Sequence, residues 1–119
     1  MTPRVTSDVF VGALVRRARA AGGFAYVARR GDSQAGAILV AFHDVQSGGY
    51  ELYQGAPPSP DRVEGRDTRR FTHARTLVGE QTLRAMVESE ARFDPDFWLV
   101  EIENWNAPVS DLLPIDDRR

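Results

Sequence analysis

The sequence contains no cysteine and no lysine, and each absence excludes a kind of chemistry. Without lysine there is no Schiff-base catalysis and no phosphate-binding lysine of a P-loop. Without cysteine there is no thiolate nucleophile, no disulfide, no iron–sulfur cluster and no cysteine-ligated zinc. All fifteen basic residues are arginine, which is typical of a genome that favours arginine codons.

A strong net charge and a long apolar run are also missing. The formal net charge is −2, whereas general nucleic-acid binding needs a clear cationic excess, so we expect no such binding. No apolar run approaches the roughly 18–20 residues that cross a bilayer. The first residues include Asp8 and no signal-peptide core, so we expect a cytoplasmic protein that does not interact with membranes.

Length and composition are those of one globular domain. The chain has 119 residues, of which 42% are hydrophobic and 27% charged. Three prolines crowd the stretch 55–66, which we expect to be a flexible loop. We expect residues 107–119 to form a docked or frayed tail of the same domain.

Hydrophobic periodicity predicts two helices. The first begins near Thr6 or Ser7, either of which can cap it, and ends at Gly22-Gly23. The second spans 79–92 and ends before Pro95, because proline disfavours helical geometry in the residue that precedes it.

Apolar runs separated by turn residues predict five strands, at 24–30, 37–43, 50–54, 69–74 and 97–104. The first three follow one another closely and indicate an antiparallel meander. The order α-β-β-β-β-α-β predicts an α+β fold with a single antiparallel sheet of about five strands and two helices. The apolar run of the last strand favours a central position in the sheet.

Three stretches carry a resemblance to a known family: 28–32 leading into 35–40, the pair Leu52-Tyr53, and 92–103, in which an FDPDxW block precedes an alternating acidic strand. On these residues the chain resembles the alphaproteobacterial domain-of-unknown-function family 1491. The resemblance implies a single-domain bacterial cytoplasmic protein. It implies no activity and no catalytic residues.

One candidate ligand site combines an arginine pair with two aspartates. Arg29 and Arg30 run into a glycine turn whose amides, with the two guanidiniums, can hold a phosphate or carboxylate. Asp94 and Asp96 would complete a concave pocket, in an anion-binding protein or a small enzyme. The alternative is a charged strand end with an aspartate-stabilised turn.

The chain offers little for metal or nucleophilic catalysis. Asp94, Asp96, Glu101 and Glu103 lie within ten residues, but their spacing is equally typical of a turn and a solvated strand face, so we expect no metal and no cofactor. The only histidines, His43 and His73, have no GxSxG serine to activate. We therefore name no catalytic residue, and an enzyme is not our first hypothesis.

The preferred hypothesis is a non-enzymatic protein-interaction module. In the last strand one face carries Trp98 and the other carries Phe97 and Leu99. If both helices cover the Trp98 face, Phe97, Leu99 and Leu39 form an uncovered apolar patch with Phe24 or Tyr26. The expected partner is an unidentified protein or a second copy of the chain in a homodimer.

Glu90 lies in the apolar stripe of the second helix. A carboxylate buried there without a partner is very costly, so we predict a structural ion pair with Arg17 or Arg29. The alternatives are an exposed helix end and a functional acid.

Overall fold

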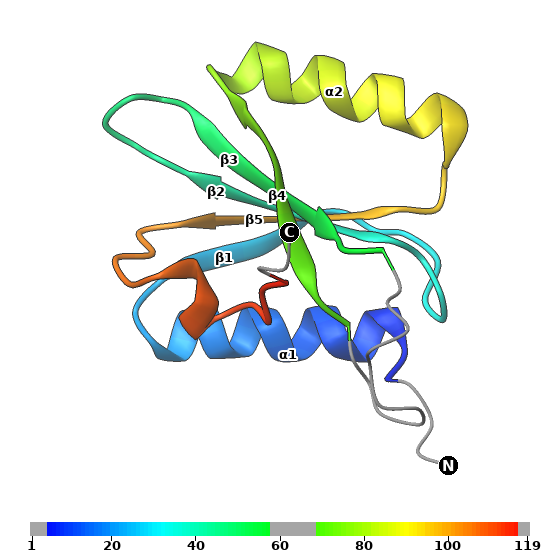
Figure 1. Ribbon diagram of the computed structural model, residues 1–119, viewed down its shortest axis with the longest axis horizontal. Coiled ribbons are helices and arrows are strands. Elements are labelled where there is room, and N and C mark those ends of the chain that lie inside the picture. The colour runs from blue at the N-terminus through cyan, green and yellow to red at the C-terminus, as the bar shows by residue number, and fades with distance from the viewer. Residues whose placement is uncertain (1–4, 58–68, 117–119) are drawn as a thin grey trace.

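One mixed β-sheet separates two helices, with α1 on one face and α2 on the other (Figure 1). The computed structural model describes residues 5–57 and 69–116. In chain order the elements are α1 (Ser7–Ala20), β1 (Phe24–Arg29), β2 (Ile38–His43), β3 (Tyr50–Gly55), β4 (Phe71–Leu77), α2 (Glu80–Phe93), β5 (Trp98–Glu103) and the 3₁₀ helix η1 (Val109–Asp111). This order confirms the predicted α+β fold. No described helix is long and apolar enough to cross a membrane.

The strand order is β1-β5-β2-β3-β4, so the last strand lies between the first two. β5 is antiparallel to β1 and parallel to β2, with Val40 opposite Val100. The sheet is therefore mostly antiparallel with one parallel pair. The predicted meander is wrong at its start, because β5 separates β1 from β2 and the meander is β2-β3-β4. β5 is apolar on both faces at its start, and only an interior strand buries both faces.

The first helix begins and ends where the sequence indicates, but a loop caps its start. The backbone N–H groups of Ser7 and Asp8 donate to the carbonyls of Gln34 and Ser33, at 3.1 and 3.0 Å. The Thr6 hydroxyl donates to the Asp8 carboxylate instead of accepting from the helix. The first amides of a helix lack intrahelical partners, and here the loop backbone supplies them.

Each face of the sheet has its own apolar core. Trp98 is 1% exposed in the core beneath α1, which confirms its predicted burial. α2 covers the opposite face, where Leu39, Phe97 and Leu99 are 8%, 1% and 3% exposed. The predicted uncovered patch on these three residues is therefore wrong, because the helices cover both faces instead of sharing one.

The C-terminal segment docks against β4. Leu112 and Leu113 are buried in the α1 core. The Phe71 amide donates to the Pro114 carbonyl, and the Asp116 amide donates to the Phe71 carbonyl, both at 2.8 Å. The tail is thus docked, not frayed, as far as Asp116. Residues 117–119 and most of the expected flexible loop lie outside the described residues, whereas Gly55 closes β3.

Candidate functional site

The arginine pair of the predicted ligand site divides between the two faces of the sheet. The guanidinium carbon of Arg29 lies 4.5 Å from the centre of the Phe97 ring, which belongs to the α2 core. That of Arg30 lies 4.9 Å from the Trp98 ring, which belongs to the α1 core. Consecutive residues of an extended chain point to opposite sides, so this geometry does not favour one anion held by both arginines.

The two aspartates lie beside this pair but engage the backbone. Asp94 Oδ1 accepts a hydrogen bond from the Asp96 amide at 3.0 Å, and the Asp96 carbonyl accepts one from the Asp32 amide at 2.9 Å. Arg29 donates to the Pro95 carbonyl at 2.8 Å. The structure therefore brings Arg29, Asp94 and Asp96 together in a braced turn, whereas Arg30 lies on the other face of the sheet against Trp98.

Two glycines explain how closely the loop after β1 approaches the start of β5. A Cβ atom at Gly31 or Gly36 would clash with the Asp96 carbonyl oxygen. Trp98 Nε1 donates to the Asp32 carbonyl at 2.8 Å, and the buried Ser7 hydroxyl donates to the Gly36 carbonyl at 2.7 Å. Two of the three stretches that carry the family resemblance, 28–40 and 92–103, thus join the loop after β1 to α1 and to β5.

The predicted ion pair between Glu90 and Arg17 is wrong, because α1 and α2 lie on opposite faces of the sheet (Figure 1). Arg17 donates to the Leu112 carbonyl at 3.1 Å. Arg29, the other candidate, stacks on Phe97 and bonds the Pro95 carbonyl. Glu90 lies half-buried at the edge of a pocket.

A groove runs between α2 and the β1 side of the sheet, with a volume of about 350 Å³. Its lining combines an apolar floor with charged rims and consists of Ala28, Arg29, Leu83, Arg84, Val87, Glu88, Leu99 and Glu101. We call it the acidic groove. Leu83 and Leu99 are buried parts of the α2 core, so the floor is a fixed surface.

Aromatic side chains continue the acidic groove along β1. The Tyr26 hydroxyl donates to Glu101 Oε1 at 2.8 Å, and the Phe24 ring lies edge-on to Tyr26 with 6.1 Å between centroids. Phe24 is 61% exposed. One strand further, His43 Nδ1 lies 3.3 Å from Glu103 Oε2. Carboxylates and rings therefore alternate on this surface.

The two tyrosines of this surface remain protonated over a wide pH range. Burial and the hydrogen bond to Glu101 raise the pKa of Tyr26 far above its usual range. Burial and then the charge of Glu101 raise the pKa of Tyr50, whose ring stacks on His43 at 4.4 Å. The hydroxyl of Tyr26 is thus protonated at neutral pH, where it donates to the Glu101 carboxylate and orients it.

The acidic strand forms no metal site in the described residues, where no three histidines or carboxylates are grouped to hold an ion. Glu101 and Glu103 instead contact Tyr26 and His43. Sequence alternation placed the two glutamates on one face of a strand. It did not reveal Tyr26 or His43 as their neighbours, because those contacts depend on which strands flank β5 and in which register.

The architecture defines a small α+β protein in which a five-stranded mixed sheet lies between one helix on each face, with a surface groove beside the second helix. The chain belongs to the family described as "Protein of unknown function (DUF1491)", whose model matches residues 5–108. This confirms the resemblance inferred from the sequence. No curated protein matches the chain.

Solved structures of bacterial relatives share the whole fold. The solution structure of protein Atu0922 from A. tumefaciens is 40% identical, with a TM-score of 0.80 and coverage of 98% of both chains. The crystal structure of a DUF1491 family protein from Caulobacter crescentus CB15 is 35% identical, with a TM-score of 0.73, and the match covers 97% of this chain and 100% of that one. An NMR structure of a DUF1491 family protein from the same organism is 36% identical, with a TM-score of 0.72 and coverage of 97% and 99%.

Proposed function

We propose that this protein is a non-enzymatic binding module whose acidic groove takes a segment of another protein that alternates arginine or lysine with apolar residues. The proposal depends on the contact between Tyr26 and Glu101, which sets an oriented carboxylate beside the half-buried Tyr26 ring and the exposed Phe24 ring, at the end of an apolar floor. This surface replaces the apolar patch on which the sequence hypothesis depended.

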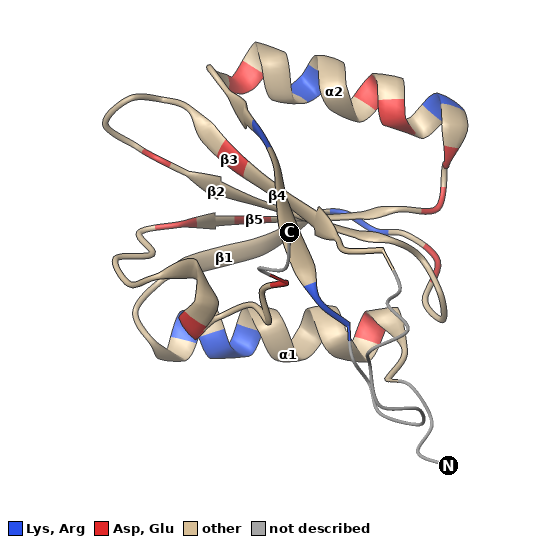
Figure 2. Cartoon of the chain, viewed as in Figure 1, with Lys and Arg blue, Asp and Glu red and all other residues tan. Residues whose placement is uncertain are grey.

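Acidic and basic residues both occur along α2 (Figure 2), and the partners of the basic residues around the acidic groove support a basic occupant. The charged residues of the lining are two acids, Glu88 and Glu101, and two bases, Arg29 and Arg84. Arg84 is paired with Glu80 at 2.8 Å, and Arg29 lies on Phe97. Both guanidiniums of the lining are therefore already engaged, which leaves the Glu88 and Glu101 carboxylates to favour guanidinium or ammonium groups and to oppose the phosphates of a nucleic acid.

The aromatic rings add a second reason for a cationic partner. Phe24 is largely exposed and packs edge-on to Tyr26, so its outer surface can receive a guanidinium. The floor residues Leu83 and Leu99 suit the apolar side chains that alternate with the charged ones. In a segment that alternates basic and apolar residues, the basic side chains can contact the aromatic rings and the apolar side chains can contact the floor.

The open edge of β1 is a poor site for strand addition. Arg19 Nε donates to the Ala25 carbonyl at 3.0 Å, and the register shifts between Val27 and Arg29. Bulges and charged side chains at an edge strand discourage pairing with another strand. The partner is therefore expected to bind through side chains in the groove.

A labelled peptide tests the proposal. We expect a fluorescein-labelled peptide that alternates arginine and leucine to bind, by fluorescence anisotropy, and citrulline in place of arginine to abolish binding. The double variant E101Q/E103Q should weaken binding by about tenfold or more, since hydrogen bonds to charged groups are strong. E51Q is the control for E101Q alone, so that each variant removes one charge, because Glu51 bonds His73 and Thr76 on the opposite side of the sheet.

Two results would overturn the proposal. Equal weakening by E51Q would mean that only the net charge of the protein matters. Sedimentation that shows a dimer dissociated by the Glu101 and Glu103 changes would make a second copy of the chain the occupant instead of a basic partner.

A further inference from the structure

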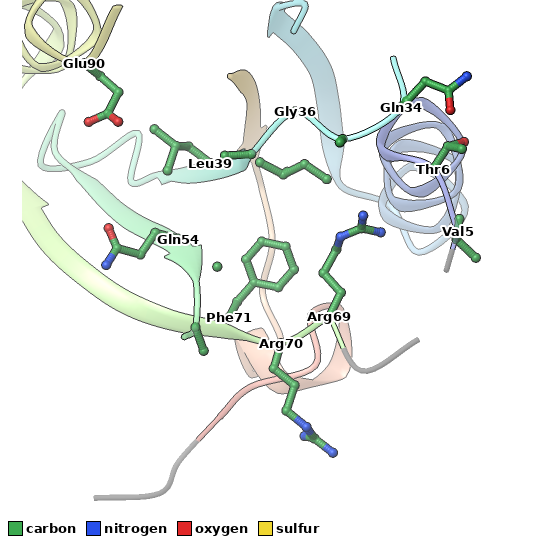
Figure 3. Close-up of a pocket in the computed structure, with 15 residues that line it drawn as sticks. Val5, Thr6, Gln34, Gly36, Leu39, Gln54, Arg69, Arg70, Phe71 and Glu90 are labelled. Carbon is green, nitrogen blue, oxygen red and sulfur yellow. The ribbon is translucent and has the colours of Figure 1, made fainter. Parts of the chain in front are cut away.

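Of the pockets outside the acidic groove, the one beside Glu90 borders both faces of the sheet (Figure 3). Its apolar residues Leu39 and Phe71 belong to the cores beneath α2 and α1 respectively, so this space does not enclose one ligand between them. A different pocket lies on one face only, at the carboxyl ends of β2 and β5. We call it the strand-end crevice.

The strand-end crevice arises because two parallel neighbours part at their ends. β2 turns back into β3, whereas β5 leads towards η1 beside α1 (Figure 1). Asn104 begins this departure with a φ of 61°, a left-handed conformation that asparagine tolerates better than most residues. Ligand sites often lie outside the carboxyl ends of parallel strands at the point where their connections diverge. The volume of about 400 Å³ is within the roughly 300–1,000 Å³ of small-ligand sites.

Aromatic side chains give the strand-end crevice an apolar surface. Phe42 and Trp105 line it, and both belong to or pack against the core beneath α1. Trp105 Nε1 donates to the Pro108 carbonyl at 3.1 Å, so the indole contributes apolar contact and its own donor is already used. No residue lines both this crevice and the acidic groove, so the site is independent of the proposed function.

Two carboxylates with a spare oxygen line the same crevice. Asp44 Oδ1 accepts a hydrogen bond from the Gln46 backbone amide at 3.0 Å. Glu51 Oε1 accepts from His73 Nε2 at 2.6 Å and from Thr76 Oγ1 at 2.7 Å. The bond from Thr76, and then that from His73, lower the pKa of Glu51, so it is ionised at neutral pH. The second oxygen of each carboxylate accepts no hydrogen bond from the part of the chain that the structure describes.

Side-chain amides supply the other polar groups of the crevice, those of Gln46, Asn104 and Asn106. Within residues 5–57 and 69–116 none of the three amides is bonded to another residue. No arginine lines the crevice in these ranges, and the basic side chain that does, His43, lies 3.3 Å from Glu103. The crevice therefore offers amide donors and carboxylate acceptors but no guanidinium to pair with an anion.

We propose that the strand-end crevice binds a neutral sugar. A hydroxyl group both donates and accepts, so neighbouring hydroxyls can donate to Asp44 and Glu51 while they accept from the side-chain amides. The C–H face of a sugar ring is apolar and suits the aromatic surface of Trp105. An anionic sugar is disfavoured because the two carboxylates repel it. An organic cation is disfavoured because it leaves the amide donors without acceptors.

The two tryptophan indole N–H signals report binding in ¹⁵N-correlated NMR spectra. Trp105 lines the crevice, whereas Trp98 is buried at the other end of β5 and is the internal reference. We expect at least one of the methyl glycosides of glucose, galactose and mannose to shift the Trp105 signal and to leave the Trp98 signal unmoved. The matching methyl uronide, in which a carboxylate replaces the hydroxymethyl group, should bind about tenfold or more weakly. Tetramethylammonium should shift neither signal.

Matched variants test the amide contacts. Q46A should weaken glycoside binding about two- to tenfold, the range for one neutral hydrogen bond. Q81A removes the same side chain from the exposed surface of α2 and should leave binding unchanged. Equal weakening by Q81A would place the sugar outside the crevice.

A second pair of variants tests the carboxylates. D44N/E51Q keeps the shape of both side chains and removes their charges, so it should abolish the preference for the glycoside over the uronide. E80Q/E90Q removes two charges from α2 and should keep that preference.

Either of two results refutes the proposal. If none of the three glycosides moves the Trp105 signal at about 50 mM, a far weaker affinity than specific sites show, the crevice takes no neutral sugar. If tetramethylammonium shifts the Trp105 signal as strongly as a glycoside does, the crevice is a site for organic cations.

Discussion

The Tyr26 hydroxyl on β1 and the Glu101 carboxylate on β5 form a 2.8 Å hydrogen bond across two antiparallel strands. The bond joins the exposed edge of the sheet to the acidic groove, because Glu101 lines the groove and Tyr26 contacts Phe24. A phenol that donates to a carboxylate resists ionisation, since loss of its proton would place two negative charges together. This contact therefore has a measurable consequence at alkaline pH.

Tyr26 should ionise at higher pH than an ordinary tyrosine. Its pKa is raised in the fold, first by burial and then by Glu101. A raised folded pKa means that the associated stability is fully present below the unfolded pKa of about 10 and is lost as pH rises. Burial raises the pKa of Tyr50 and Tyr53 as well, so absorbance at 295 nm should show late titration of the tyrosines, and Y26F should remove the part of it that belongs to Tyr26. E101Q should lower the pKa of Tyr26 only in part, because burial remains. Full titration of all tyrosines near pH 10 would contradict this.

Trp98→Ala should lower the free energy of unfolding by about 3–5 kcal/mol, the usual cost of deleting a large core aromatic. The side chain is buried beneath α1, and its Nε1 also donates a hydrogen bond to the Asp32 carbonyl. Urea denaturation followed by circular dichroism measures the difference. A change of less than about 1 kcal/mol would show that the surrounding core does not depend on this ring.

Gly31→Ala should destabilise the protein by about 1–3 kcal/mol, the cost of overpacking a tight site. The added methyl group meets backbone atoms of Asp96 and Phe97, which have little freedom to move away. Gly55→Ala is the matched control, because an added Cβ there meets no atom within 4 Å. Thermal unfolding of both variants tests the contrast, and equal melting temperatures would refute it.

Glu90→Gln should leave the free energy of unfolding within about 0.5 kcal/mol of the parent, as for most surface substitutions. The reason is that Glu90 is half-buried at a pocket edge and its two predicted arginine partners bond elsewhere. Denaturant titration at neutral pH gives the value. A loss of about 3 kcal/mol would reveal a buried charge pair.

Local sequence patterns predicted much of the architecture, including the ends of both helices and the interior position of the last strand. The first helix ends at Gly22, whose φ of 93° suits glycine, and the helix before Pro95 ends where proline requires. The apolar run that begins at Trp98 indicated an interior strand, because such runs can be satisfied only by burial on both faces. These features depend on neighbours within a few residues, which a single sequence contains.

The same apolar run did not predict which face of β5 each helix covers, and therefore did not predict the groove. Phe97 and Trp98 are both strongly apolar and face opposite sides, so periodicity is satisfied whichever side a helix covers. β4 is antiparallel to β3, and β3 to β2, whereas β5 is parallel to β2, so α2 is a crossover helix between parallel strands. The face of the sheet that α2 covers is set by the handedness of this crossover, which is a property of the three-dimensional connection and not of the local sequence.

The sequence alone determined the order of helices and strands, the burial of Trp98 and the family, because each depends on residue type and near-neighbour spacing. Only the tertiary structure decided that Arg29 and Arg30 lie on different cores, that Glu90 and Arg17 are separated by the sheet, and that Tyr26 meets Glu101. These relationships join residues far apart in the chain. They arise from strand order and register, which minimise the exposed apolar area of the whole sheet and which no short stretch of sequence specifies.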